Sequence, residues 1–100
     1  MIEKMFDSKG AIFITAVGTP LDSKGGLVER SFRRHLKDHI RNGIDGFLVM
    51  GTMGMIPSIS NSTYIRGVEV AVDEIGNKAR IMVGVGDNSI ERTLERINSV

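Results

Sequence analysis

Hydrophobic residues along the chain form two alternating patterns. Short, nearly continuous apolar runs rich in β-branched residues occupy residues 11–17, 46–50 and 79–85. Such runs predict strands of a parallel sheet with helices on both faces, or of a barrel with helices outside, because half-exposed strands alternate apolar with polar residues. Residues with helical spacing fill the intervals between the runs.

Three helical stripes follow the three predicted strands. They consist of Val28, Phe32, Leu36 and Ile40; of Ile65, Val68, Val72 and Ile75; and of Ile90, Leu94 and Ile97. The expected helix ends are a left-handed cap at Asn42-Gly43, an N-cap at Ser60 with a stop at Gly76, and an N-cap at Asn88 or Ser89.

The strand–helix unit repeats about every 34 residues. This order predicts parallel strands joined by right-handed crossovers. An eight-unit barrel of about 250 residues allots ~31 residues to each unit, close to this spacing; a doubly wound sheet is the alternative. The third helix has hardly begun at Val100, and three strands alone leave two unpaired edges. We therefore expect residues 1–100 to be the N-terminal portion of one larger domain.

Composition excludes several classes of protein. The 41% hydrophobic fraction is too high for a disordered chain, and the net charge of +1 gives no strong field for nucleic acid or an anionic membrane. No apolar run approaches the roughly 20 residues of a membrane span, and residues 1–10 lack the apolar block of a signal peptide. Without cysteine there is no disulfide, thiolate metal site or cysteine nucleophile. A cytoplasmic protein is expected.

The candidate chemistry lies in the three segments that follow the strands, at residues 18–26, 51–55 and 84–89, because parallel α/β folds bind ligands at the carboxyl ends of strands. In the second segment Gly51 and Gly54 bracket Thr52 and Met53. The backbone can turn sharply there and offer N–H groups to a small carboxylate or a phosphate. The alternative is a tight loop with a structural threonine. The third segment lacks the spacing of a nucleotide-binding loop.

Other polar and methionine clusters favour structural roles. His35 and His39 lie one helical turn apart, but leucine occupies the position of the zinc-protease glutamate and no third ligand is evident, so no metal site is expected. A basic stripe is interpreted as a solvated outer helix face; it comprises Arg30, Arg34, Lys37 and Arg41. Met50 and Met82 are expected in the core, whereas Met53 and Met55 are candidates to line a pocket.

Four motifs occur in a familiar order: Gly18-Thr19-Pro20, Asn42-Gly43-Ile44-Asp45-Gly46, Gly51-Thr52-Met53-Gly54 and Gly84-Val85-Gly86-Asp87-Asn88-Ser89. Over nearly the whole chain this set resembles the N-terminal third of the dihydrodipicolinate synthase/N-acetylneuraminate lyase family, where the stretches are T-P, N-G-x-D-G, G-[TS]-T-G-E and G-x-G-x-N-[ST].

The resemblance implies the N-terminal three βα units of a (β/α)8 TIM barrel, usually a homotetramer, that needs no cofactor and joins pyruvate to a lysine as a Schiff base. Thr52 would be catalytic, in a proton relay with tyrosines. The backbone N–H of Met53 would hold the pyruvate carboxylate. Gly51 and Thr19 would complete the substrate-binding residues, with Thr19 packed near the base of the site.

The sequence departs from the family pattern in several places. Met53 replaces the second threonine of the motif, Met55 replaces its glutamate, and the following helix start, residues 60–63, carries no acids. The stretch between Gly10 and Pro20 is longer than the family norm. These departures indicate a divergent branch.

An imine-forming lysine must be desolvated inside the pocket so that its amine is free. The chain has five lysines: Lys4, Lys9, Lys24, Lys37 and Lys78. Only Lys24 falls on the catalytic edge, in a turn expected to be exposed. The only tyrosine, Tyr64, falls on the second helix. In the family the Schiff-base lysine and the acid tyrosine come from strands six and five, which lie beyond Val100.

The leading hypothesis is a class I aldolase-type lyase that takes pyruvate and a small aldehyde. The family's default reaction is the condensation of pyruvate with aspartate semialdehyde in lysine biosynthesis, catalysed by dihydrodipicolinate synthase. The alternative within the family is a 2-keto-3-deoxy sugar-acid or N-acetylneuraminate-type aldolase. These 100 residues alone are expected to be inactive. A different class of protein, a non-enzymatic small α/β ligand-binding domain, would require a stable oligomer to cover the sheet edges.

Overall fold

A computed structural model describes residues 12–100. Its three strands, β1 (Ile14–Ala16), β2 (Gly46–Val49) and β3 (Arg80–Val83), form one parallel sheet in the order β1-β2-β3. Between the strands run α2 (Glu29–Arg41) and, after the short 3-10 helix η1 (Ile56–Ser58), α3 (Asn61–Ile75). The last element is α4 (Ile90–Ser99). All three predicted strands and helices are present, although the strands are shorter than predicted; Ala11 lies outside the described residues.

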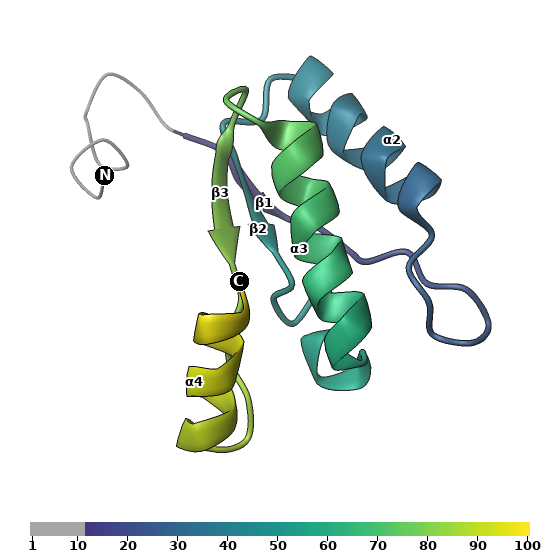
Figure 1. Ribbon diagram of the computed structural model, residues 1–100. Coiled ribbons are helices and arrows are strands. Elements are labelled where there is room, and N and C mark those ends of the chain that lie inside the picture. The colour runs from purple at the N-terminus through teal and green to yellow at the C-terminus, as the bar shows by residue number, and fades with distance from the viewer. Residues whose placement is uncertain (1–11) are drawn as a thin grey trace.

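Helices α2 and α3 lie side by side on one face of the sheet (Figure 1). The strand register sets Thr15, Phe47 and Ile81 on this face and Ala16, Leu48 and Met82 on the other. Phe47 is fully buried, whereas Ala16 is exposed. Right-handed crossovers that always step in the same direction put every helix on one face, which is the arrangement of a barrel wall. Within one half of a doubly wound sheet the helices also lie on a single face, so these elements by themselves are compatible with either fold.

The predicted helix ends are confirmed. The Ser60 hydroxyl accepts a hydrogen bond from the Thr63 amide at 3.2 Å, and the Ser89 hydroxyl accepts one from the Arg92 amide at 3.1 Å. These bonds satisfy amides that the first helical turn leaves without partners. Gly43 and Gly76 follow their helices with φ of 88° and 54°, a region that glycine enters without a steric penalty.

Ion pairs join α2 to α3 on their solvent side. Arg66 of α3 donates two hydrogen bonds of 2.7 Å to the Glu29 carboxylate, and Arg33 of α2 pairs with Asp73 at 2.7 Å. Lys37, one residue of the predicted basic stripe, lies 3.9 Å from Glu74. Water screens such exposed ion pairs and they contribute little to stability, so the buried apolar residues between the helices dominate the packing.

Two helix faces differ from the sequence prediction. Val72 of α3 is 51% exposed, because the buried face of this helix runs instead through Tyr64, Gly67, Val68, Ala71 and Ile75. The predicted apolar stripe of α4 is exposed as well, since no described element covers that face; the residue that α4 buries is Arg96.

Of the two methionines expected in the core, Met50 is fully buried and Met82 is half-buried. No helix among residues 12–100 is long and apolar enough to cross a bilayer.

The carboxyl ends of β2 and β3 approach each other so closely that residue 84 must be glycine. A Cβ on Gly84 would overlap the carbonyl oxygen of Met50 and lie 2.8 Å from its carbonyl carbon. A Cβ on Gly86, two residues further on, would meet nothing within 4 Å.

We expect Gly84→Ala to destabilise the protein by about 2 kcal/mol or more, because two backbone segments must move apart. For the matched control, Gly86→Ala, we expect a free energy of unfolding within about 0.5 kcal/mol of that of the parent protein. Urea unfolding of the three proteins provides the test, and equal midpoints for the two variants would contradict the close approach.

Candidate functional site

The three segments that follow the strands meet at the carboxyl edge of the sheet, as the sequence predicted. The Val17 amide donates to the Leu48 carbonyl at 3.1 Å, so the chain after β1 continues beside β2. The Gly84 amide donates to the Val49 carbonyl at 2.8 Å, which holds the chain after β3 against the end of β2. The loop after β2, residues 51–54, therefore lies between the other two segments.

This loop begins and ends at left-handed residues that are not glycine. Met50 has φ 59° and Met55 has φ 64°, a conformation that costs an ordinary L-residue roughly 1–2 kcal/mol. A Cβ on Gly54 would lie 2.9 Å from both N and Cα of Met50, so the loop folds back onto its own start. Strained backbone of this kind is concentrated at ligand-binding and catalytic sites.

Within the loop, the groups that the sequence indicated remain available to a ligand. The Thr52 carbonyl accepts from the Met55 amide at 3.0 Å. Among the described residues, neither the Thr52 hydroxyl nor the backbone N–H of Met53 makes a hydrogen bond. The predicted small-anion site therefore has the donors that it needs, a backbone N–H and a hydroxyl, at one exposed turn.

A cavity of about 540 Å³ opens beside Thr52. Its wall continues through η1, the N-terminal turn of α3, the segment 86–88 and the guanidinium groups of Arg92 and Arg96 on α4. Lys24, Lys37 and Lys78, the lysines that the structure describes, do not line this cavity. Lys24 is in an exposed turn, as expected, where its amide donates to the Asp22 carboxylate at 2.8 Å.

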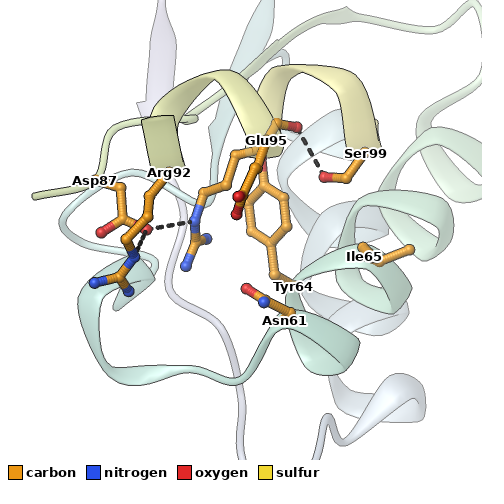
Figure 2. Close-up of a pocket in the computed structure, with 8 residues that line it drawn as sticks. Asn61, Tyr64, Ile65, Asp87, Arg92, Glu95 and Ser99 are labelled. Atoms are coloured by element: carbon orange, nitrogen blue, oxygen red, sulfur yellow. Dashed lines mark hydrogen bonds and ion pairs between the residues drawn. The ribbon is translucent and has the colours of Figure 1, made fainter. Parts of the chain in front are cut away.

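A second pocket adjoins this cavity between α3 and α4 (Figure 2). Asp87 and Arg92 lie at one end of it, Ser99 lies at the other, and the Tyr64 ring lies between them. Asp87 Oδ2 accepts a hydrogen bond from Arg96 Nε at 3.2 Å and forms an ion pair with Arg92 Nε at 3.3 Å. The sequence prediction missed this ionic cluster, although the four-residue spacing of the two arginines places them on one face of a helix.

Tyr64 connects this pocket to the end of β3. Its hydroxyl donates to the Gly84 carbonyl at 2.7 Å, and burial raises the pKa of the phenol, so that it stays a neutral donor. The Arg96 guanidinium lies 4.5 Å from the centre of the Tyr64 ring. Arg96 Nη1 has no hydrogen-bond partner among the described residues, and the ring face beneath the cation offsets part of that loss.

On the other side of the loop, Met53 and Met55 line a shallow apolar pocket, as predicted. Its remaining wall comes from residues 18–20 and from Ser31 and His35 of α2. Burial, with a smaller contribution from the neighbouring His39, lowers the pKa of His35, so the ring is neutral at pH 7. The pocket is therefore apolar apart from a few neutral polar groups.

The two histidines do not assemble a metal site within the described residues. Their rings lie 4.3 Å apart, edge to face, and His39 Nδ1 is already bonded to the His35 carbonyl oxygen at 2.9 Å. No group of three potential ligands among histidine, aspartate and glutamate occurs in residues 12–100. Most of the predicted basic stripe on this helix is exposed.

Comparison with known proteins gives consistent matches. The model of the Dihydrodipicolinate synthetase family matches residues 9–98. The 4-hydroxy-tetrahydrodipicolinate synthase of Oenococcus oeni is 31% identical over 93 residues, covering 87% of this chain and 32% of that protein. The enzyme of the same name from Bartonella tribocorum is 33% identical, covering 87% and 29%. The chain thus spans about a third of the length of the curated relatives that it matches.

Solved structures give the same picture of the fold. The 4-hydroxy-tetrahydrodipicolinate synthase of Methylacidiphilum fumariolicum superimposes with a TM-score of 0.82 at 26% identity, covering 91% of this chain and 30% of that one. A dihydrodipicolinate synthase from Acinetobacter baumannii, complexed with pyruvate, has a TM-score of 0.82 at 23% identity, covering 87% and 30%. These neighbours are TIM barrels, and the expected fold of N-terminal βα units is confirmed.

The ionic cluster predicts a pH dependence of stability. The Asn88 amide, followed by Arg96 and Arg92, lowers the pKa of Asp87 in the folded protein. A lowered folded-state pKa stabilises the protein above the unfolded value of about 3.9, and this stabilisation disappears as the pH falls through the folded value.

We therefore expect Asp87→Asn to lower the urea midpoint at pH 7 and the difference from the parent to shrink as the pH falls below about 4. Glu95→Gln, an exposed change in the middle of α4, serves as the control and should have no such effect. A difference between Asp87→Asn and the parent that stays constant with pH would contradict the role of the carboxylate.

Proposed function

The chain belongs to the dihydrodipicolinate synthetase family, and from this membership we propose that the protein carrying it is a class I aldolase-type enzyme that forms a Schiff base with pyruvate. The proposed reaction is that of 4-hydroxy-tetrahydrodipicolinate synthase, the condensation of pyruvate with aspartate semialdehyde. Support comes from the curated relatives, which carry this name, and from the pyruvate complex of a solved neighbour.

The observation that carries the proposal is the strained turn after β2. It presents the Met53 N–H and the Thr52 hydroxyl, both without partners among the described residues, at the edge of the sheet where βα folds bind ligands. Pyruvate has a carboxylate of the size that such a turn can hold. In the proposal, the amides of Gly51 and Met53 bind this carboxylate and orient the keto carbon.

The chemistry requires an amine that the described lysines do not bring into the cavity. We propose that a lysine in sequence after Val100 attacks the keto carbon, with loss of water to give an imine. The protonated imine withdraws electrons, so a proton leaves the pyruvate methyl group and the resulting enamine attacks the aldehyde carbon. Thr52 serves in this scheme by passing protons between the substrate and tyrosines of the complete protein.

Two further parts of the proposal concern the complete protein: its aldehyde substrate and its oligomeric state. A 2-keto-3-deoxy sugar-acid or N-acetylneuraminate-type aldolase, which uses a different aldehyde, is the alternative. The synthase is proposed because the relatives named above are synthases. A homotetramer is proposed as well. One solved relative, 28% identical, is described as the first monomeric dihydrodipicolinate synthase variant, which supports an oligomer as the usual state.

The proposal predicts a covalent pyruvate adduct. When the natural gene product is incubated with pyruvate and borohydride, its intact mass should increase by one reduced pyruvate, because the imine is trapped as a stable amine. Lactate, which has no keto group, is the matched control and should leave the mass unchanged. If pyruvate gives no adduct, the Schiff-base enzyme is excluded and the non-enzymatic ligand-binding domain is favoured.

A second prediction concerns the hydroxyl of Thr52. In the complete enzyme, Thr52→Val should lower kcat by about 10²-fold or more, the scale of lost proton-transfer catalysis. Thr52→Ser keeps the hydroxyl and should retain most of the rate. A near-normal kcat for Thr52→Val would remove this side chain from the mechanism.

A further inference from the structure

We propose that Thr19 is a positioning residue, whose buried hydroxyl holds the turn at residues 51–54 in the conformation that binds the pyruvate carboxylate. This inference rests on the proposed function, because it assigns a role in the same site. Thr19 acts through the backbone of Gly54 and not by touching the substrate.

The contact itself is short and shielded from water. Thr19 lies three residues beyond the end of β1 and is only 6% exposed. Its Oγ1 donates to the Gly54 carbonyl oxygen at 2.6 Å and lies 3.6 Å from the Met50 sulfur. The hydroxyl proton is therefore committed to the protein, which leaves no donor on this side chain for a ligand.

The turn needs an external contact because its own hydrogen bonds are few. Two backbone bonds close it, from the Met55 amide to Thr52 and from the Ile56 amide to Gly51, the second with a long N···O distance of 3.4 Å. Within the described chain, and apart from the long bond from Ile56 of η1, the bond from Thr19 is the only hydrogen bond that joins residues 51–54 to a segment outside the turn. Both flanking residues, Met50 and Met55, are in the left-handed region, so the turn has strain to release if this contact is lost.

The hydrogen bond between Thr19 and Gly54 lies next to the proposed carboxylate site. Gly54 directly follows Met53, whose N–H is the proposed donor to pyruvate, and the chain at Gly18 runs beside the Met53 carbonyl. A fixed Gly54 carbonyl limits rotation of the neighbouring peptide planes and thereby the direction of the Met53 N–H. A shift of about 1 Å in such a positioning group is enough to reduce catalytic efficiency by ~10²-fold.

The test compares variants of the complete enzyme by steady-state kinetics. Thr19→Val is expected to raise the KM for pyruvate by about 10- to 100-fold while leaving the KM for the aldehyde unchanged. Thr19→Ser, which restores the hydroxyl, should return the pyruvate KM close to that of the parent. The control is Thr15→Val in β1, a half-buried threonine whose hydroxyl has no partner among the described residues; its kinetics should be unchanged.

A merely structural role for Thr19 predicts something different. It would reduce thermal stability and the fraction of active enzyme, so kcat would fall while the pyruvate KM stayed constant, and that outcome overturns the proposal. If Thr19→Val does not fold, Thr19→Ala removes the hydroxyl with a smaller side chain and replaces it in the test. An unchanged pyruvate KM in the folded Thr19→Ala variant would likewise overturn the proposal.

Hydrogen exchange separates this inference from the proposed function. The amides of Met55 and Ile56, whose hydrogen bonds close the turn, should exchange faster in Thr19→Val than in the parent, whether or not the protein reacts with pyruvate. If the parent forms no borohydride adduct, the proposed reaction fails and the exchange rates alone decide whether Thr19 holds the turn. Equal exchange in both proteins would overturn that role.

Discussion

The crowding around Met50 is the constraint on which the other features of the site depend. This buried residue leaves β2 in a left-handed conformation, and glycines from three segments pack directly against it. A Cβ at Gly54 or Gly84 would collide with its backbone, and one at Gly67 would collide with the end of its side chain. The loop and the end of β3 can therefore approach each other only because Gly54 and Gly84 lack a side chain, whereas at Gly67 the flexible end of Met50 fills the space that a side chain would take.

The close packing of Gly84 against Met50 determines the geometry of the carboxyl edge of the sheet. With Gly84 held against the end of β2, the Tyr64 hydroxyl reaches the Gly84 carbonyl and ties α3 to the segment after β3. That segment carries Asp87, which pairs with both arginines of α4. The cavity beside Thr52 and the adjoining pocket between α3 and α4 are thus bounded by residues whose positions depend on one close approach of two strands.

The departures from the family motif have different consequences on the two sides of the turn. A carboxylate bound by backbone N–H groups does not depend on the side chain of residue 53, so a methionine there is compatible with the proposed pyruvate site. The side chains of Met53 and Met55 point instead to the pocket beside α2, which they make apolar. The replacement of threonine and glutamate by methionine therefore changes the surroundings of the turn and removes one hydroxyl, but leaves its backbone donors in place.

The elements, their order and the position of the candidate turn could all be predicted from local sequence patterns. Helix caps such as Ser60 and Ser89 act on amides three residues away, so their effect is readable from local sequence. Gly51 and Gly54, which bracket the turn, can likewise be recognised from the local sequence. The long-range contacts around the candidate site are visible only in the tertiary structure. The hydroxyl of Thr19 reaches a carbonyl 35 residues away, and α4 buries Arg96 while its apolar stripe stays exposed. Such contacts depend on how packed elements lie against one another, which the periodicity of a single segment does not specify.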